Sequence, residues 1–487
     1  MNFLLAFFAG ALYTLGFEPY ALWPITIFSI CLLFHTIHVS PSRSLSLLFC
    51  FALGKNSFGI TWIYHSVATF GNAEPFLASV IVGLLVLVLS AFYLPGGLLL
   101  KFLGRRQQIG FLLLLFASVL TLTEWLLTWL LSGFPWLFVG HAVVDTKLST
   151  LLPIIGSLGV GWLVYLIAGA LYVGFSRRKG FFILLAVTPW LMAFLLSFVV
   201  WGKEQQEVRV ALVQANLKQD RKWLMEERSR NLEKHLALSD ENWGYDLIVW
   251  PEAAITLFGI EAQRALELLD QKALQANTNF ISGIPTLDPV DGTNKNSLVA
   301  IGQGKGIYSK QHLVPFGEYV PFESVLRGLI GFFDLPMSRM SAGSPGQDSL
   351  TLAINGANFD VSPAICYEIA YGESLRKRSI NSSAIITVSN DTWFGPTNGP
   401  WQHLQIARVR ALENAKPVIR ATNNGVTAVI DKNGRVVDKL PQFTSDVLRS
   451  TVNLTQGRTP YSYLGNWPIL FMIFLVFLYL WIRSRTL

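Results

Sequence analysis

Cysteine is scarce in this 487-residue sequence. Three are present, and Cys366 is the only one in the polar stretch that begins near residue 205. A thiol with no second cysteine in its own domain cannot form an intradomain disulfide or a cysteine-rich metal site. Cys366 also stands between a strand-like run and a helix-like run, so we expect it to be either a nucleophile or an inert core residue.

Charge is equally scarce in the first 200 residues, which hold 13 of the 69 charged side chains. With 52% hydrophobic residues and a mean hydropathy of +0.44, the chain is too apolar for an ordinary soluble protein of this length. Apolar runs close to the ~20 residues that cross a ~30 Å hydrocarbon core predict about eight transmembrane helices. The predicted spans are residues 2–17, 22–38, 44–63, 76–100, 109–131, 150–175, 181–201 and 467–482.

Basic residues in the short loops predict the orientation, because translocated short loops are depleted in lysine and arginine. The loops after the second, fourth and sixth spans and the tail after the eighth are basic, whereas the alternate loops carry acidic residues and one exception, Lys147. We therefore expect both termini in the cytoplasm and residues 205–462 outside it. The net charge of +7 partly reflects this topology, so it gives little support to a nucleic-acid partner.

Three sites inside the predicted spans are unusual because they carry charged or polar side chains: Lys55, Glu124 and the His35/His38 pair. Ionisable groups inside a membrane often mark a ligand site or a transport path. The simpler interpretation places Lys55 and Glu124 near an interface or pairs them within the bundle. It places the two histidines at a cytoplasmic helix end.

After Val208, short β-branched runs alternate with helical and turn segments, as expected for an α/β domain. This region has no phosphate-cradling glycine-rich loop and no zinc-ligand spacing, so we expect neither a cofactor nor a metal. Helical periodicity fits Glu261–Ala276 and Gln402–Asn414. The expected strands are Val208–Asn216, Asp246–Trp250, Asn279–Ile284, Asn296–Ile301, Phe359–Ile365, Ala384–Ser389, Val418–Thr422 and Thr427–Asp431.

Three strand ends in this domain carry reactive groups. Pro251 ends the strand Asp246–Trp250, so that Glu252 projects from its tip. Lys310 precedes an apolar turn, and Cys366 follows another expected strand. A carboxylate can accept a thiol proton, and a lysine ammonium can stabilise a thiolate and a tetrahedral oxyanion. Together, Glu252, Lys310 and Cys366 indicate acyl transfer.

The motifs that carry a family resemblance are Trp250-Pro-Glu252, Lys310-Gln-His-Leu-Val-Pro-Phe-Gly-Glu318-Tyr-Val-Pro, Ile365-Cys366-Tyr-Glu, Gly16-Phe-Glu18-Pro, Thr123-Glu-Trp-Leu, Gly133-Phe-Pro-Trp, Leu212-Val-Gln-Ala-Asn216, Ser389-Asn-Asp-Thr-Trp-Phe-Gly and Arg420-Ala-Thr-Asn-Asn-Gly425. The first three resemble the Glu-Lys-Cys triad of the nitrilase, or carbon–nitrogen hydrolase, superfamily. All of them together resemble its membrane branch, the apolipoprotein N-acyltransferases, over nearly the whole chain.

The resemblance implies a polytopic α-helical membrane bundle and an extracytoplasmic α/β nitrilase-like domain built as an αββα sandwich. With the topology, it divides the chain into a seven-helix transmembrane region at 1–204, a periplasmic catalytic domain at 205–462, and a last transmembrane helix with a short cytoplasmic tail at 463–487. It places the protein in the cell inner membrane. It also implies a monomer.

The resemblance implies that Glu252 is the general base, that Lys310 stabilises the oxyanion and that Cys366 is the nucleophile. The cysteine would accept an acyl chain from a membrane phospholipid, with phosphatidylethanolamine as the expected donor. The resulting thioester would pass the chain to the α-amino group of the diacylglyceryl-modified N-terminal cysteine of an apolipoprotein. This ping-pong reaction is the final step of lipoprotein maturation in that family.

Residues next to the triad are expected to support it. The backbone N–H of Tyr367 is the expected second oxyanion donor, because the residue after the nucleophile commonly fills that role. Glu318 is expected either to orient Lys310 or to share its proton, and Glu368 to shape the pocket beside Cys366.

Three further features have two interpretations each. Trp223 is either an aromatic wall near the entrance or a core anchor, and Asn390 either contacts substrate or satisfies loop backbone groups. The apolar segment 326–340 is either a mobile lid or an ordinary core helix. In the lid interpretation, Phe332 and Phe333 line the acyl path.

Two other functions stay open. A membrane-anchored amidase would use the same triad with water as the acceptor, although a small soluble substrate does not require eight spans. A transporter with an external regulatory domain would use Lys55 and Glu124, but it leaves Glu252, Lys310 and Cys366 without a role.

Overall fold

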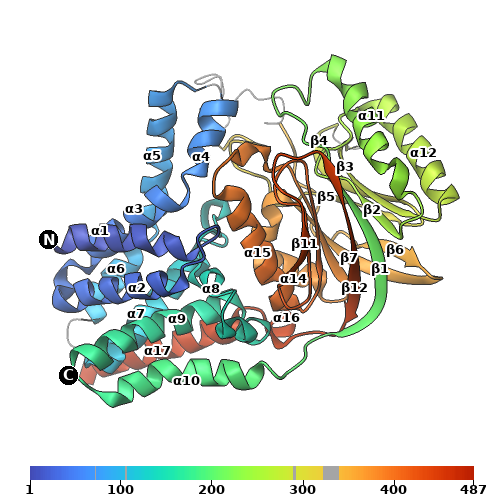
Figure 1. Cartoon of the computed structure of the whole chain (residues 1–487). Coiled ribbons are helices and arrows are strands. Elements are labelled where there is room, and N and C mark those ends of the chain that lie inside the picture. The colour runs from blue at the N-terminus through green and yellow to red at the C-terminus, as the bar shows by residue number, and fades with distance from the viewer. Residues whose placement is uncertain (72, 105–106, 289–291, 322–338, 487) are drawn as a thin grey trace. The chain divides into compact units, whose positions relative to one another are not determined.

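The computed structural model describes residues 1–71, 73–104, 107–288, 292–321 and 339–486 (Figure 1). The chain forms two compact units. Unit 1 comprises Met1–Tyr64, Pro75–Val200 and Thr459–Leu487, and unit 2 comprises His65–Glu74 and Trp201–Arg458. Residues 65–74 thus belong to unit 2 although apolar helices flank them, a feature that the sequence did not suggest.

The described residues of unit 1 form helices and no strand, and Figure 1 shows these helices from blue to green, with the last helix in red. The helices are α1 (Asn2–Tyr13), α2 (Trp23–Val39), α3 (Ser44–Gly59), α4 (Trp62–His65), α5 (Pro75–Ala91), α6 (Leu94–Leu103), α7 (Ile109–Leu126), α8 (Val139–Ala142), α9 (Leu152–Ser176), α10 (Gly180–Leu196), α16 (Pro460–Leu464) and α17 (Trp467–Thr486).

Several of these helices can cross a membrane by length and composition. Among the described residues, Pro75–Leu103, Ile109–Leu126 and Lys147–Ser176 pass that test singly. Trp23–Val39 and Pro41–Gly59 pass it together, although the pair is bent by 107°. Asn2–Gly16, Gly180–Leu196 and Trp467–Arg483 are apolar but shorter. The apolar helices coincide with the predicted apolar runs, while the number of crossings stays a prediction.

Unit 2 contains two six-stranded sheets. Its β-branched runs form the strands because their alternating side chains can pack on a pleated surface. The strands are β1 (Lys203–Gln214), β2 (Leu247–Val249), β3 (Asn279–Leu287), β4 (Asn294–Gly302), β5 (Gly306–Ser309), β6 (Leu350–Ile354), β7 (Ala357–Ile365), β8 (Ala384–Ser389), β9 (Val418–Thr422), β10 (Ala428–Ile430), β11 (Val436–Lys439) and β12 (Asp446–Gln456).

The two sheets share one pattern of strand directions. The first runs β12-β1-β2-β3-β4-β5, and the second runs β11-β10-β9-β8-β7-β6. In each sheet, the two central pairings are parallel: β1 with β2 and β2 with β3, and β7 with β8 and β8 with β9. The outer pairings are antiparallel.

One hydrophobic core joins the facing sides of the sheets, with Leu212 and Val249 from the first sheet and Ile365 and Val388 from the second among its members. Helices α11 (Arg228–Ser239) and α12 (Gly259–Gln275) cover the other side of the first sheet through a second core. Helices α14 (Gly372–Ser379) and α15 (Gly399–Asn414) contact β7 and β9 of the second sheet (Figure 1). The predicted αββα sandwich is therefore present.

Candidate active site

The predicted triad residues all follow strands of unit 2. Glu252 comes after β2, Lys310 directly follows β5, and Cys366 directly follows β7. Loops beyond the carboxyl ends of central parallel strands are the usual position for a ligand site in such sheets. The fold brings the three residues together, since the charges of Glu252 and Lys310 both act on the thiol of Cys366.

Glu252 is 7% exposed, and protein groups hold both of its carboxylate oxygens. The backbone N–H of Asn390 donates to Oε2 at 2.8 Å, and Asn296 Nδ2 donates to Oε1 at 2.7 Å. Gly283 allows the turn to form, because a Cβ there would lie only 2.7 Å from Glu252 Cα. The carboxylate is thus fixed in one orientation, as a positioned general base requires.

Lys310 is buried at 1% exposure, with its ammonium between two carboxylates. Nζ lies 2.8 Å from Glu318 Oε2 and 3.6 Å from Glu252 Oε1. Burial alone would lower the pKa of Lys310, but the charges of Glu318 and then Glu252 outweigh it and raise that pKa above its usual value. The lysine is therefore a permanent cation beside the thiol, as an oxyanion donor must be.

Cys366 begins the short 3₁₀ helix Cys366–Ala370 with φ +54°, and its side chain remains partly exposed. Burial raises the pKa of its thiol, the charge of Glu252 raises it further, and Lys310 partly offsets both. The thiol therefore keeps its proton at neutral pH until a base accepts it during attack. A non-glycine residue in the left-handed region is strained and persists only where its surroundings enforce it.

Glu368 is fully buried and joins the lysine loop to the nucleophile turn. Its Oε1 accepts hydrogen bonds from Tyr308 Oη at 2.8 Å, Gln311 N at 2.8 Å and His312 N at 3.2 Å. Its Oε2 accepts from Ile365 N at 2.8 Å. Glu368 thus fixes the residues that directly precede Cys366 relative to those that follow Lys310.

Glu318 and Tyr367 also lie at the site. Besides its contact with Lys310, Glu318 accepts hydrogen bonds from Val314 N at 2.8 Å and Asn296 Nδ2 at 3.0 Å, so it can orient the ammonium. Tyr367 is 9% exposed and packs edge-on against Tyr371 at 5.2 Å between ring centroids.

Asn390 lies in the interior of the loop network. Its backbone N–H holds Glu252, its Nδ2 donates to Gln219 Oε1 at 2.6 Å, and its Oδ1 accepts from Thr392 and Asn423. The Asn390 side chain thus contacts other side chains of the loops rather than the loop backbone groups that one interpretation expected, and a role in substrate contact stays a prediction.

Trp223 packs against Phe258 with ring centroids 6.0 Å apart. Its indole N–H is buried without a hydrogen-bond partner in the described part of the chain. The predicted lid residues Phe332 and Phe333 lie outside the described residues.

Residues 65–74 pack against the loop that holds Glu252. Ser66 Oγ donates to the carbonyl of Trp393 at 2.7 Å, and Phe70 meets the Trp393 ring edge-on at 5.2 Å. Trp393 follows Asn390 by three residues. A segment that lies between two apolar helices in the sequence therefore braces the catalytic loop.

Sequence reasoning missed Asn296 and Lys222. Asn296 Nδ2 bridges Glu252 and Glu318, and its position at the start of an expected strand was the available signal. Lys222 is 1% exposed and donates to the carbonyl of Glu252 at 3.0 Å. Burial lowers the pKa of Lys222 to about 8, although the charge of Glu252 acts in the opposite direction.

The ionisable residues of unit 1 are engaged by other side chains. Lys55, at 2% exposure, donates to Tyr93 Oη at 2.9 Å. Glu124, fully buried, accepts from Tyr165 Oη at 2.7 Å and from Val139 N at 3.0 Å. His35 Nδ1 lies 3.0 Å from Tyr172 Oη. His38 Nε2 lies 3.1 Å from an Arg177 nitrogen. Lys55 and Glu124 thus have partners within the bundle, and His38 lies in the last turn of α2, at a helix end, as the simpler interpretation expects.

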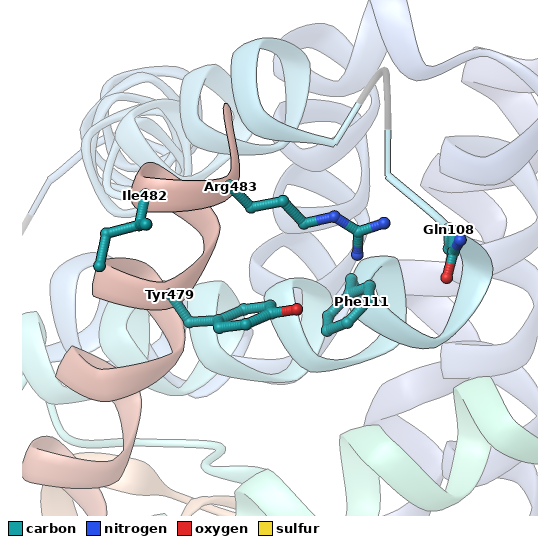
Figure 2. Close-up of a pocket in the computed structure, with 5 residues that line it drawn as sticks. All are labelled: Gln108, Phe111, Tyr479, Ile482 and Arg483. Carbon is teal, nitrogen blue, oxygen red and sulfur yellow. The ribbon is translucent and has the colours of Figure 1, made fainter. Parts of the chain in front are cut away.

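Unit 1 also contains a shallow pocket lined by Gln108, Phe111, Tyr479, Ile482 and Arg483 (Figure 2). The Arg483 guanidinium lies over the Phe111 ring at 4.4 Å, and Phe111 stacks on Tyr479 at 5.1 Å. None of these five residues carries a thiol or a carboxylate, so this pocket lacks the groups that acyl transfer through a thioester requires.

The chemistry available in unit 2 is that of a thiol flanked by a fixed carboxylate and a buried ammonium. Such a set can form and break an acyl–sulfur bond. In the described ranges, no group of three or more histidine, cysteine, aspartate or glutamate side chains is arranged to hold a metal ion.

Comparison with known proteins connects both units to one family. A carbon-nitrogen hydrolase family model matches residues 209–459, and a model of the apolipoprotein N-acyltransferase N-terminal domain matches residues 9–170. An apolipoprotein N-acyltransferase of Photobacterium profundum is 38% identical over 96% of this chain and 92% of its own. The apolipoprotein N-acyltransferase of Vibrio parahaemolyticus is 38% identical to this chain over 99% of this chain and 97% of its own. That of Shewanella oneidensis is 39% identical over 97% of this chain and 94% of its own.

Proposed function

Because the chain belongs to the apolipoprotein N-acyltransferase family, we propose that it transfers an acyl chain from a membrane phospholipid to the amino terminus of an apolipoprotein. The observation that carries this proposal is the convergence of Cys366, Glu252 and Lys310 at the strand ends of unit 2. The reaction is an acyl transfer in two steps with a thioester intermediate on Cys366.

In the first half-reaction, Cys366 Sγ attacks the ester carbonyl carbon of the phospholipid while Glu252 takes the thiol proton. Lys310 Nζ and the Tyr367 N–H stabilise the negative oxygen of the tetrahedral intermediate. The carbon–oxygen ester bond then breaks, Glu252 returns the proton to the leaving oxygen, and a lysophospholipid departs. The acyl chain remains on sulfur.

In the second half-reaction, the α-amino group of a diacylglyceryl-modified N-terminal cysteine attacks the thioester carbonyl. Glu252 takes a proton from the attacking nitrogen and returns one to the leaving sulfur. The products are an N-acylated lipoprotein and the free thiol. Each step uses the same carboxylate as base and then as acid, which agrees with its fixed position between Asn296 and Asn390.

The membrane part of the proposal rests on hydropathy and loop charge. We propose eight spans, a multi-pass location in the cell inner membrane, cytoplasmic termini and a catalytic domain in the periplasm. Because each buried methylene contributes ~0.8 kcal/mol, an enzyme that meets both lipid substrates in the bilayer avoids exposing acyl chains to water. We further propose that the protein acts as a monomer and that phosphatidylethanolamine is the donor.

Purified full-length protein in detergent micelles that contain phosphatidylethanolamine, incubated with a diacylglyceryl peptide that has a free N-terminal cysteine amine, tests this proposal. We expect the peptide to gain the mass of one acyl chain on its amino group while lysophospholipid accumulates. Cys366→Ala should produce neither. Free fatty acid in place of acylated peptide would instead identify the protein as a hydrolase and overturn the proposal.

A further inference from the structure

A buried polar chain reaches the backbone of the nucleophile from α15. His403 Nε2 lies 3.1 Å from the carbonyl oxygen of Cys366. His403 Nδ1 lies 3.1 Å from Arg420 Nη2, which in turn donates to Asp391 Oδ2 at 2.6 Å. These three side chains are at most 2% exposed, and the half-reactions above assign them no role.

The carbonyl of Cys366 determines the protonation of Nε2 of His403. A carbonyl oxygen can only accept, so Nε2 carries a hydrogen and donates it to Cys366 O. Burial, followed by the charge of Arg420, lowers the pKa of His403, so the ring is neutral near pH 7. Nδ1 lies 3.1 Å from Arg420 Nη2 and also 3.1 Å from Asp391 Oδ1. Ser389 Oγ donates to Asp391 Oδ1 at 2.5 Å, which satisfies the carboxylate oxygen nearest the ring.

The hydrogen bond from His403 is made to the backbone of Cys366, whose conformation is strained. Cys366 has φ +54°, and a non-glycine residue in this region is held there by its neighbours. Glu368 fixes the N–H of Ile365 on one side of the nucleophile. His403 fixes the carbonyl of Cys366 on the other side.

The carbonyl that His403 binds belongs to the same peptide unit as the Tyr367 N–H. A trans peptide is planar, and its C=O and N–H point in opposite directions. We propose that His403 is a positioning residue: by donating to Cys366 O, it aims and polarises the Tyr367 N–H as an oxyanion donor. Hydrogen bonds in series strengthen one another where the local dielectric is low, so the effect reaches the oxyanion through the peptide.

This inference rests on the proposed function, because it assumes that Cys366 reacts through a tetrahedral intermediate. The inference also gives a reason for burying three polar side chains, Arg420, Asp391 and His403. Burying the Arg420–Asp391 pair and a histidine requires desolvation that apolar side chains of similar volume would avoid. A polar chain that ends on the nucleophile's peptide gives that arrangement a chemical purpose.

Two electrophiles separate oxyanion stabilisation from thiol placement in the full-length protein. A p-nitrophenyl ester acylates a thiol through a tetrahedral oxyanion, whereas iodoacetamide alkylates it by direct displacement without one. Both reactions can be followed by mass spectrometry of the Cys366 peptide, which distinguishes it from Cys31 and Cys50. The amide nitrogen of glutamine can replace Nε2 of histidine, whereas that of asparagine falls near Nδ1, so His403→Gln and His403→Asn form a matched pair.

We expect His403→Asn to slow acylation by the ester about 10- to 100-fold, below the 10²–10³-fold cost of deleting an oxyanion donor, and to leave alkylation within about two-fold. His403→Gln should retain most of both rates. Parallel loss of both rates in His403→Asn, or unchanged acylation, would overturn the inference. If wild type reacts with the ester as expected but never with phospholipid, the proposed function fails while the role of His403 stands.

Discussion

The carboxylate of Glu318 lies 2.8 Å from the Lys310 ammonium, closer than the 3.6 Å that separates this ammonium from Glu252. The lysine is therefore held mainly by a carboxylate other than the proposed base. Glu252 is held by Asn296 and the backbone of Asn390. Because Glu318 is the closer partner of the ammonium, Glu252 can exchange a proton without releasing Lys310.

Replacing Lys310 with methionine should damage both stability and catalysis. Removing one partner of a buried ion pair costs about 3–5 kcal/mol, and removing an oxyanion donor slows reaction about 10²–10³-fold. We expect Lys310→Met to unfold at a lower temperature in detergent and to lose acyl-enzyme formation. In the double variant Lys310→Met/Glu318→Gln, stability should recover in part while activity stays low. Joint recovery of stability and activity would contradict the catalytic role of the lysine.

Glu252→Gln should retain the fold and slow acylation of Cys366 about 10²–10⁴-fold, the usual contribution of a positioned base. Burial still raises the thiol pKa in the variant, so the thiol keeps its proton at neutral pH, and glutamine cannot take that proton during attack. Single-turnover release of lysophospholipid measures the effect. Glu233→Gln, an exposed site on α11, is the matched control and should leave the rate unchanged. A Glu252→Gln rate within ten-fold of wild type would exclude this carboxylate as the base.

Glu368→Gln should loosen the lysine loop and the nucleophile turn together. Glutamine offers one acceptor oxygen where Glu368 accepts four hydrogen bonds, and each buried donor left unsatisfied costs about 1–3 kcal/mol. We expect lower thermal stability and a lower kcat. Tyr308→Phe removes only one of those donors and should cost about 0.5–1.5 kcal/mol with little change in kcat. Equal kcat in Glu368→Gln and wild type would remove Glu368 from the positioning role.

Acidification should lower the free energy of unfolding through the buried imidazole of His235. It is fully buried on α11, its Nδ1 donates to Asn231 O at 2.7 Å, and burial lowers its pKa to about 4. As the pH falls, the histidine of the unfolded chain takes up a proton near pH 6.5, whereas His235 of the folded chain does so only near pH 4. This contribution to stability is thus complete above about pH 6.5 and is lost as pH falls to about 4, by at most about 3 kcal/mol. Thermal unfolding between pH 7.5 and 4.5 measures it.

His235→Phe is the matched variant, because a phenyl ring can keep the packing against Trp250, whose ring centroid lies 4.9 Å from that of His235. The variant should lose less stability than wild type between pH 6.5 and 4. An identical pH profile would assign the acid sensitivity to other groups.

The sequence predicted the central strands well because their signals are local. Ala384–Ser389 and Val418–Thr422 coincide with β8 and β9, where every residue is buried and β-branched residues are frequent. The strand β12 was missed, since exposed polar residues interrupt its apolar positions and its pairing with β1 joins segments more than 200 residues apart. Residues 65–74 were assigned to a membrane loop for the same reason: only tertiary contacts place them in unit 2.

The triad was also visible in the sequence because its residues follow buried strands within distinctive motifs. Its supporting groups were not. Asn296, Lys222 and His403 reach Glu252 or Cys366 through hydrogen bonds. Apart from the position of Asn296 at the start of an expected strand, their local sequence does not distinguish them from core or helix residues. Contacts between residues that are distant in the sequence can be identified only from the structure.

The most direct test of a thioester on Cys366 is to incubate the full-length protein with phospholipid and no acceptor. The account predicts that the Cys366 peptide gains one acyl chain, that neutral hydroxylamine removes it, and that an added diacylglyceryl peptide takes it up. Acylation of that peptide by Cys366→Ala, or by wild type whose Cys366 never carries an acyl chain, would contradict the account.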